Sequence, residues 1–271
     1  MFSGKTQLAL SLMINTILPA STTKINGEVV YISTKRNFCP QRVNELIENA
    51  KMSKYMTKKK ALKRIHHRCV KDVVELIKTI YQLHKFVKDK RKSSKDKKVS
   101  GKKDYSRIRL LIVDSFATHL QGFESIEKTR LSHELLHILS DIAKRNNCAI
   151  VLTNDMVEDD DGEKNYPDFV HLKPNLGDEF SHLMPQRIYM VKAENDQVVA
   201  NVEKSLCHGP SLLMFQITAR GIEDNLSEDD SFCTEDDSCS EWNSGCACET
   251  LKSETFWENF PVIFKLVMRS Q

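Results

Sequence analysis

The sequence predicts an α/β fold with a mostly parallel sheet and antiparallel strands at its edge. Segments of helical periodicity separate short runs rich in β-branched and other apolar residues, at 27–34, 109–113 and 148–153. Further short strands then follow one another at 187–191, 198–203 and 212–219. Strands that alternate with helices pair in parallel, whereas strands that follow one another directly pair antiparallel.

The helices are predicted from the spacing of apolar residues and from proline positions. Pro19 ends a helix that starts at Gly4, and Pro40 opens a second helix. Apolar residues at helical spacing predict further helices at 61–87 and 127–145. The segment 155–176 carries no clear periodicity and is expected to be a long loop.

The beginning of the chain carries the most specific motif. Ser3-Gly4-Lys5-Thr6, followed by an apolar helical run, matches the second half of the phosphate-binding pattern G-x-x-x-x-G-K-[ST]. Lys5 is placed to reach terminal phosphates, the Thr6 hydroxyl to reach Mg²⁺, and the amides at the helix start to face an anion. The printed sequence has three residues before Gly4, so it lacks the lead-in strand and the first half of this loop.

Two polar residues stand at the predicted ends of neighbouring strands. Asp114 closes the strand at 109–113, and Asn154 closes the strand at 148–153. Ligands of open α/β sheets bind at the carboxyl ends of the strands. We therefore expect Asp114 to hold Mg²⁺ and the Asn154 amide to sense a terminal phosphate, beside Lys5 and Thr6.

Charge is distributed unevenly along the chain. Residues 51–107 contain 21 Lys or Arg and 5 Asp or Glu, whereas residues 223–258 contain 1 Lys and 12 acidic residues. We predict a core over residues 1–224 with a basic, disordered insert at 88–105, and an acidic, disordered tail over 225–271. The insert has three open interpretations, which are a solvated loop, a nuclear-import signal and a patch for the DNA backbone.

Composition excludes several classes of protein. No apolar run reaches the roughly 18 residues of a membrane span, and the start of the chain does not have the pattern of a signal peptide. The eight cysteines have no framework spacing, which favours reduced thiols in a cytosolic or nuclear protein. His66, His67 and Cys69 stand in a cationic segment and are interpreted as surface residues, not as metal ligands.

Several stretches together resemble the RecA-type recombinases in their eukaryotic strand-exchange branch, and the chain is similar to the group C paralogues. The matching stretches are SGKTQLAL, GEVVYIST, RLLIVDS, LSHELLHILSDIAKRNNCAIVLTNDM and LGDEFSHLMPQRIYM. The resemblance implies a RecA-like P-loop ATPase core with ATP and Mg²⁺ as cofactors. It assigns cofactor binding to Ser3, Gly4, Lys5, Thr6, Gln7, Asp114 and Asn154, and the metal to Thr6 and Asp114.

The chain also departs from the family pattern. Catalytic members carry a glutamate that aligns the attacking water after the second strand, where this chain has Ser33-Thr34-Lys35-Arg36. The counterpart of the DNA-contacting loop, 157–173, contains the acidic run Glu158-Asp159-Asp160-Asp161, which would repel phosphates. We therefore assign no catalytic residue and expect no strand exchange by this chain.

The resemblance implies a mediator of homologous-recombination repair of DNA double-strand breaks, acting in the nucleus and in meiosis. Its implied partners are other recombinase paralogues (of the spindle-B type), the main strand-exchange recombinase and DNA, with no membrane. Two alternatives stay open at this point: a DNA-dependent ATPase whose N-terminus is incomplete in this sequence, and a nucleotide-free adaptor. The docking surface expected for a partner is the exposed edge of the sheet.

Overall fold

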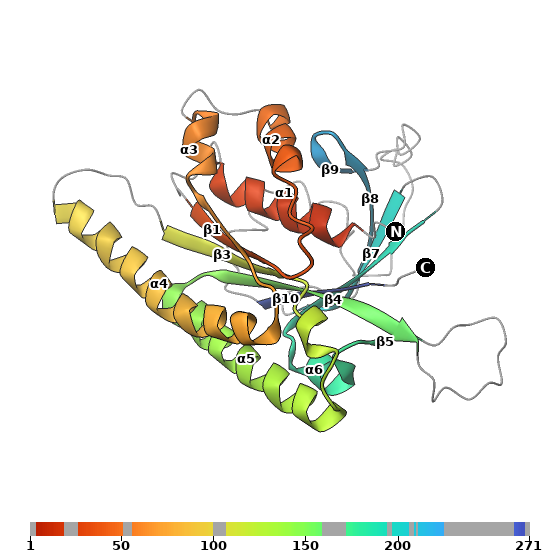
Figure 1. Ribbon diagram of the computed structural model, residues 1–271. Coiled ribbons are helices and arrows are strands. Elements are labelled where there is room, and N and C mark those ends of the chain that lie inside the picture. Colours follow the sequence, from red (N-terminus) through yellow and green to blue (C-terminus); the bar gives the residue numbers. More distant parts are fainter. Residues whose placement is uncertain are drawn as a thin grey trace, which may run out of the picture.

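The computed structural model has a single large sheet with helices on both of its faces (Figure 1). It describes residues 4–18, 27–50, 56–99, 107–158, 172–193, 197–205, 209, 211–224 and 263–268. Within these ranges, no helix is both long and apolar enough to pass through a bilayer.

The sheet is parallel over most of its width and antiparallel at one side. Its strands lie in the order β2-β1-β3-β4-β10-β6-β7-β8-β9, and β5 pairs with β4 outside this path. The parallel part comprises β2 (Ile65–Cys69), β1 (Gly27–Ser33), β3 (Arg107–Asp114), β4 (Ala149–Glu158), β10 (Ile263–Met268) and β6 (Gln186–Lys192). The antiparallel part adds β7 (Gln197–Lys204), β8 (Ser211–Thr218) and β9 (Gly221–Asp224). This confirms the α/β fold class expected from the sequence.

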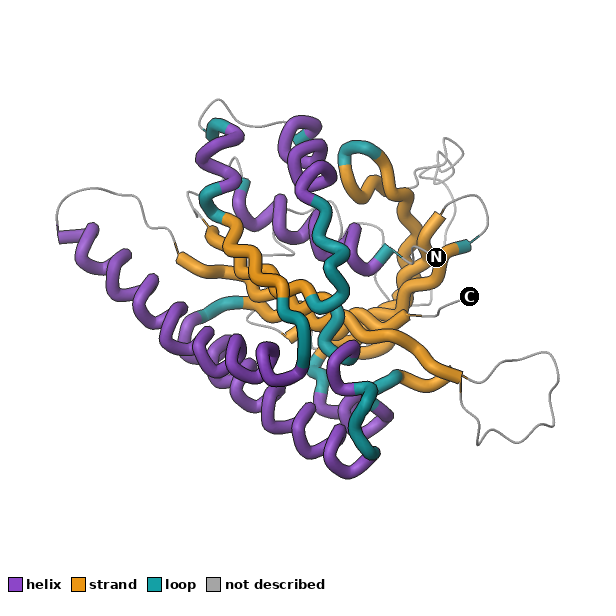
Figure 2. Tube along the Cα trace, in the orientation of Figure 1, coloured by secondary structure: helices purple, strands orange, loops and turns teal. Residues whose placement is uncertain are grey.

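The helices divide between the two faces of the sheet, as Figure 2 also shows. One face carries α1 (Lys5–Ile17), α2 (Pro40–Asn49) and α3 (Lys58–Leu62). The other face carries α4 (Val73–Val99), α5 (Ser125–Asn146) and α6 (Gly177–Leu183), with a short 3-10 helix at Thr118–Leu120. We call these the α1 face and the α5 face.

Side chains alternate between the two faces along each strand, as the pleat requires. In β1, Val29 and Tyr31 pack in the core of the α1 face, and Val30 and Ile32 pack in the core of the α5 face. In β4, Val151 belongs to the α1 face and its neighbours to the α5 face. This alternation decides which polar residues of a strand can reach the start of α1.

Gly4 sets the entry into α1. Its φ of 83° lies in the left-handed region that favours glycine. A Cβ atom at this position would lie 3.3 Å from Ile217 and 3.4 Å from Met190 and Val198. Glycine therefore meets both the backbone and the packing requirement where the chain turns into the helix.

The predicted helix at 61–87 is wrong over its first part. The structure has the short helix α3, then the edge strand β2, and the long helix starts at Val73. The helical spacing of Ile65, Cys69 and Val73 misled the prediction, because residues 65–69 instead pair with β1 along its outer side. Without this pairing, backbone groups of the buried strand β1 would lack partners.

The basic segment is helical where a disordered insert was expected. Helix α4 continues to Val99, and residues 100–106 lie outside the described ranges. Residues 88–99 contain no glycine or proline, and Lys and Arg are good helix formers, so local propensity favours continuation of α4.

Two further expectations need correction. The loop expected at 155–176 begins as a continuation of β4 to Glu158 and ends with β5 (Leu172–Pro174), which pairs antiparallel with β4.

The tail expected to be disordered contributes β10, which lies between β4 and β6 and is parallel to both. Residues 263–268 are mostly strand formers, and they satisfy backbone groups that β4 and β6 would otherwise bury unpaired. Residues 225–262 and 269–271 lie outside the described ranges.

We predict that removal of residues 263–271 lowers the free energy of unfolding by several kcal/mol. The strand is paired on both sides, and each backbone hydrogen bond contributes about 1 kcal/mol, against a total stability of about 5–15 kcal/mol. Urea unfolding measured by circular dichroism checks this. Removal of residues 269–271 alone is the control, and equal midpoints for the two truncated chains would contradict the pairing of β10.

Candidate nucleotide-binding site

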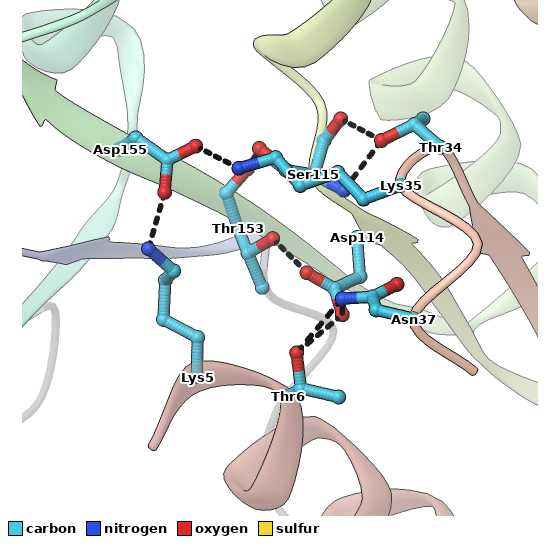
Figure 3. Close-up of polar contacts among 9 residues, drawn as sticks. All are labelled: Lys5, Thr6, Thr34, Lys35, Asn37, Asp114, Ser115, Thr153 and Asp155. Carbon is cyan, nitrogen blue, oxygen red and sulfur yellow. Dashed lines mark hydrogen bonds and ion pairs between the residues drawn. The ribbon is translucent and has the colours of Figure 1, made fainter. Parts of the chain in front are cut away.

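Polar side chains from four segments meet at the carboxyl ends of β1, β3 and β4, beside the N-terminus of α1 (Figure 3). Lys5 and Thr6 open α1, and Asp114 ends β3. Thr153 and Asp155 come from β4, and Lys35 and Asn37 from the segment after β1. Of the four residues expected together at one rim of the sheet, Lys5, Thr6 and Asp114 lie there and Asn154 does not.

Asp114 is the centre of this network. The residue is 2% exposed, and its carboxylate accepts hydrogen bonds from four side chains. Thr6 Oγ1 and Tyr31 Oη lie 2.8 Å from its Oδ2, Asn37 Nδ2 lies 3.1 Å from the same atom, and Thr153 Oγ1 lies 2.6 Å from Oδ1. A buried charge is tolerated when it is hydrogen-bonded in this way.

The donors tie Asp114 to the rest of the fold. Tyr31 lies in the middle of β1, and burial together with the negative charge of Asp114 raises its pKa far above the usual value. The phenol therefore stays protonated and keeps donating. Thr34 Oγ1 and the backbone of Ser115 exchange hydrogen bonds of 2.8 and 2.9 Å, which fix the ends of β1 and β3 relative to each other.

A second cluster lies next to the first and consists of three charged residues. The ammonium group of Lys5 contacts Oδ1 of Asp155, and Lys35 Nζ lies 2.6 Å from Oδ2 of the same carboxylate. Burial by itself would raise the pKa of Asp155, but hydrogen bonds and charges from Lys35 and Lys5 outweigh it and hold this pKa below its usual value. Asp155 is therefore an anion held by two cations.

The structure does not bring Asn154 into the site. Thr153 and Asp155 belong to the site and lie on the α1 face of β4. Because side chains alternate along a strand, Asn154 points to the α5 face. Its side chain is 1% exposed, and both of its polar atoms have no hydrogen-bond partner in the described structure. The sequence analysis also expected β4 to end here, whereas the strand continues to Glu158.

Sequence reasoning missed Asp155, Thr153 and Tyr31. The available signal was strand periodicity, because residues at alternate positions along a strand share a face, which groups Thr153 with Asp155 and separates both from Asn154. Taken from the buried run Ile150-Val151-Leu152, this rule leaves two candidate sets and does not by itself say which faces α1. The packing of α1 on Val151 makes that choice.

Gln7 borders a pocket of about 420 Å³ next to the phosphate-loop residues. The pocket is lined by Gln7, Arg42, Lys192, Val198, Ile217, Thr218 and Ala219. Arg42 Nε donates to Gln7 Oε1 at 2.9 Å, and the guanidinium also donates to the carbonyl groups of Thr218 and Ala219. The volume of this pocket is within the range of small-molecule sites, which extends from about 300 to 1,000 Å³.

The oxygen atoms of Thr6 and Asp114 fit a magnesium ion in chemical type. A hydroxyl and a carboxylate 2.8 Å apart form part of the all-oxygen environment that Mg²⁺ prefers, with phosphate oxygens and water completing the set. When bound, the ion supplies positive charge to the phosphate chain. Ser3, the remaining residue of the expected site, lies outside the described ranges.

The histidines near β2 have partners other than a metal. His66 Nε2 lies 2.6 Å from Glu28 Oε2, and His67 lies 2.9 Å from Ser33 Oγ and stacks on Phe38. Burial lowers the pKa of His67. Within the described ranges, no group of three or more His, Cys, Asp or Glu residues is arranged to hold a metal ion.

A mostly parallel sheet with antiparallel edge strands and a lysine-threonine helix start facing a strand-end aspartate defines a RecA-like core. The Rad51 family model matches residues 1–225, and the chain belongs to this family. It is 27% identical to a meiotic recombination protein DMC1 homolog of Lilium longiflorum over 227 residues, and 28% identical to that of Glycine max. It is 26% identical over 240 residues to DNA repair protein RAD51 homolog 3 of Cricetulus griseus. Each alignment covers 82% of this chain, which spans 59–60% of the length of these relatives.

We predict that Tyr31→Phe lowers the free energy of unfolding by about 1–3 kcal/mol. The change removes a buried hydrogen bond to a charged acceptor, which typically contributes that amount. Equilibrium urea unfolding measures it. Tyr81→Phe is the matched control, because Tyr81 donates to the carboxylate of Glu134 on the exposed surface and should change nothing measurable. Equal effects of the two substitutions would contradict the central role of Asp114.

Proposed function

We propose that this protein binds ATP with Mg²⁺ and acts as a recombination mediator together with other recombinase paralogues. The observation that supports ATP binding best is the placement of Lys5 and Thr6 at the start of α1, where Lys5 contacts Asp155 of β4 and Thr6 contacts Asp114 at the end of β3. The nearby pocket lined by Gln7 and Arg42 has room for a nucleoside beside the phosphate-binding turn.

The proposed activity is binding with slow turnover. Lys35, just after β1, lies where the family resemblance expects a water-orienting carboxylate, and its ammonium group is hydrogen-bonded to Asp155. A protonated lysine does not accept a proton from water. Loss of such general-base assistance typically costs about 10²–10⁴ in rate.

The mediator role rests on family membership and on the edge of the sheet. The names of the relatives assign meiotic recombination and DNA repair to those proteins, and we extend homologous-recombination repair of DNA breaks to this chain. In the described structure, β2 is the edge strand next to β1, and an edge strand is a surface on which a partner's segment can pair. The basic segment Lys88–Lys98 is consistent with import into the nucleus.

A nucleotide-free adaptor is the second candidate. This candidate is favoured by the ion pairs of Lys5 and Lys35 with Asp155, because both lysines already have an anionic partner without a nucleotide. Direct measurement of ATP binding separates the two candidates, because an adaptor requires no nucleotide.

We predict that Lys5→Ala weakens ATP binding at least tenfold. A charge-assisted hydrogen bond is worth about 1.5–3 kcal/mol, which corresponds to about 10–100-fold in affinity. Fluorescence titration with a labelled ATP analogue in the presence of Mg²⁺ measures the change. Lys58→Ala is the control, because Lys58 forms an exposed ion pair with Glu48 on α2, away from the site. Equal affinities for the two variants, or no binding by the unmodified chain, would favour the adaptor.

For the mediator role, we predict a stable pair with another recombinase paralogue after coexpression and affinity purification.

For the slow turnover, we predict that the isolated chain releases phosphate from ATP at least about 10²-fold more slowly than an intact recombinase, with or without single-stranded DNA. Long filaments of the isolated chain on DNA, or turnover equal to that of the recombinase, would contradict the mediator role and favour strand exchange.

A further inference from the structure

Asp155 occupies the two cations that face the start of α1. Its carboxylate contacts the ammonium group of Lys5 through one oxygen and that of Lys35 through the other. The side chains of Lys5 and Asp155 are 13% and 18% exposed, and that of Lys35 is 43% exposed. The three groups therefore form a partly buried cluster with two positive charges and one negative charge.

This arrangement resembles a bound anion held by two lysines. A phosphate group at the same place would receive the same donors, and it would also face the amide groups at the N-terminus of α1. A phosphate and the Asp155 carboxylate are both negative, and two such charges a few Å apart repel each other strongly in a partly buried site. They therefore compete for Lys5 and Lys35.

The two lysines come from different elements of the fold, which supports competition between Asp155 and a phosphate for them. Lys5 belongs to α1 and lies beside Thr6, which contacts Asp114, so it is fixed in the site. Lys35 comes from the segment after β1 and is the more exposed of the two, which leaves it free to turn with a new anionic partner. Among the described residues, its ammonium group is held by the Asp155 carboxylate, so its position in the site depends on that group.

We propose that Asp155 is a built-in competitor for the terminal phosphates of the nucleotide and that Lys35 is the second phosphate-binding cation of the site. This inference rests on the nucleotide-binding function proposed above. When a triphosphate binds, Lys5 and Lys35 exchange the carboxylate for phosphate oxygens, and Asp155 is released from them. The internal carboxylate keeps the affinity of the site low.

The test uses the full chain and two probes, inorganic tripolyphosphate and ATP, titrated by isothermal calorimetry. Asp155→Asn keeps the shape of the side chain and removes its charge. The variant should bind tripolyphosphate at least about tenfold more tightly than the unmodified chain. Lys35→Gln added to Asp155→Asn should reverse most of this gain. Asp141→Asn is the matched control, because it removes an exposed ion pair with Arg145 on α5 and should leave the affinity unchanged.

The outcomes separate this inference from the proposed function. Tighter tripolyphosphate binding by Asp155→Asn supports Asp155 as a competitor for phosphate, whether or not ATP binds. Failure of ATP to bind would count against the proposed function only. Weaker binding by Asp155→Asn would show that the carboxylate positions Lys5 for phosphate, which overturns the inference while ATP binding stands. Unchanged binding, or a double variant equal to Asp155→Asn, overturns the inference as well.

Discussion

The burial of one carboxylate organises this protein. Asp114 lies at the end of β3, nearly inaccessible to solvent, and the free energy of removing a charge from water must be offset by donors. Those donors come from α1, β1, β4 and the segment after β1, so satisfying Asp114 brings four separate parts of the chain to one rim of the sheet. The candidate site is a consequence of this requirement.

The neighbouring cluster of Lys5, Lys35 and Asp155 sets the electrostatic character of the rim. Lys5 follows the turn at Gly4, which has a left-handed backbone and little room for a side chain beside β6, β7 and β8. From this helix start, Lys5 contacts Asp155 of β4. Lys35 stands where a catalytic carboxylate is expected from the family resemblance, and Asp155 is its partner across the site. Two positive charges against one negative charge leave the cluster with a net positive charge, which suits an anion.

The continuity of the sheet depends on a strand from far along the sequence. Strand β10 lies between β4 and β6, runs parallel to both, and its last residue, Met268, is in register with Asp155. It therefore ends at the rim where the site lies, in the direction that a strand leading into a phosphate-binding loop takes. Since β6 to β9 attach to the rest of the sheet through β10, this strand joins the antiparallel part, which contacts Gly4, to the part that carries Asp114.

The sequence by itself determined the fold class, most strands and helices, and the roles of Lys5, Thr6 and Asp114 as site candidates, because periodicity and the Gly-Lys-Thr motif are local signals. Tertiary structure alone decided that Asp155 rather than Asn154 faces α1, since the packing of a helix chooses which face of a strand becomes the site. It also decided that residues 65–69 and 263–268 are strands. Their conformation satisfies the backbone of β1, β4 and β6, and those partners lie far away in the sequence.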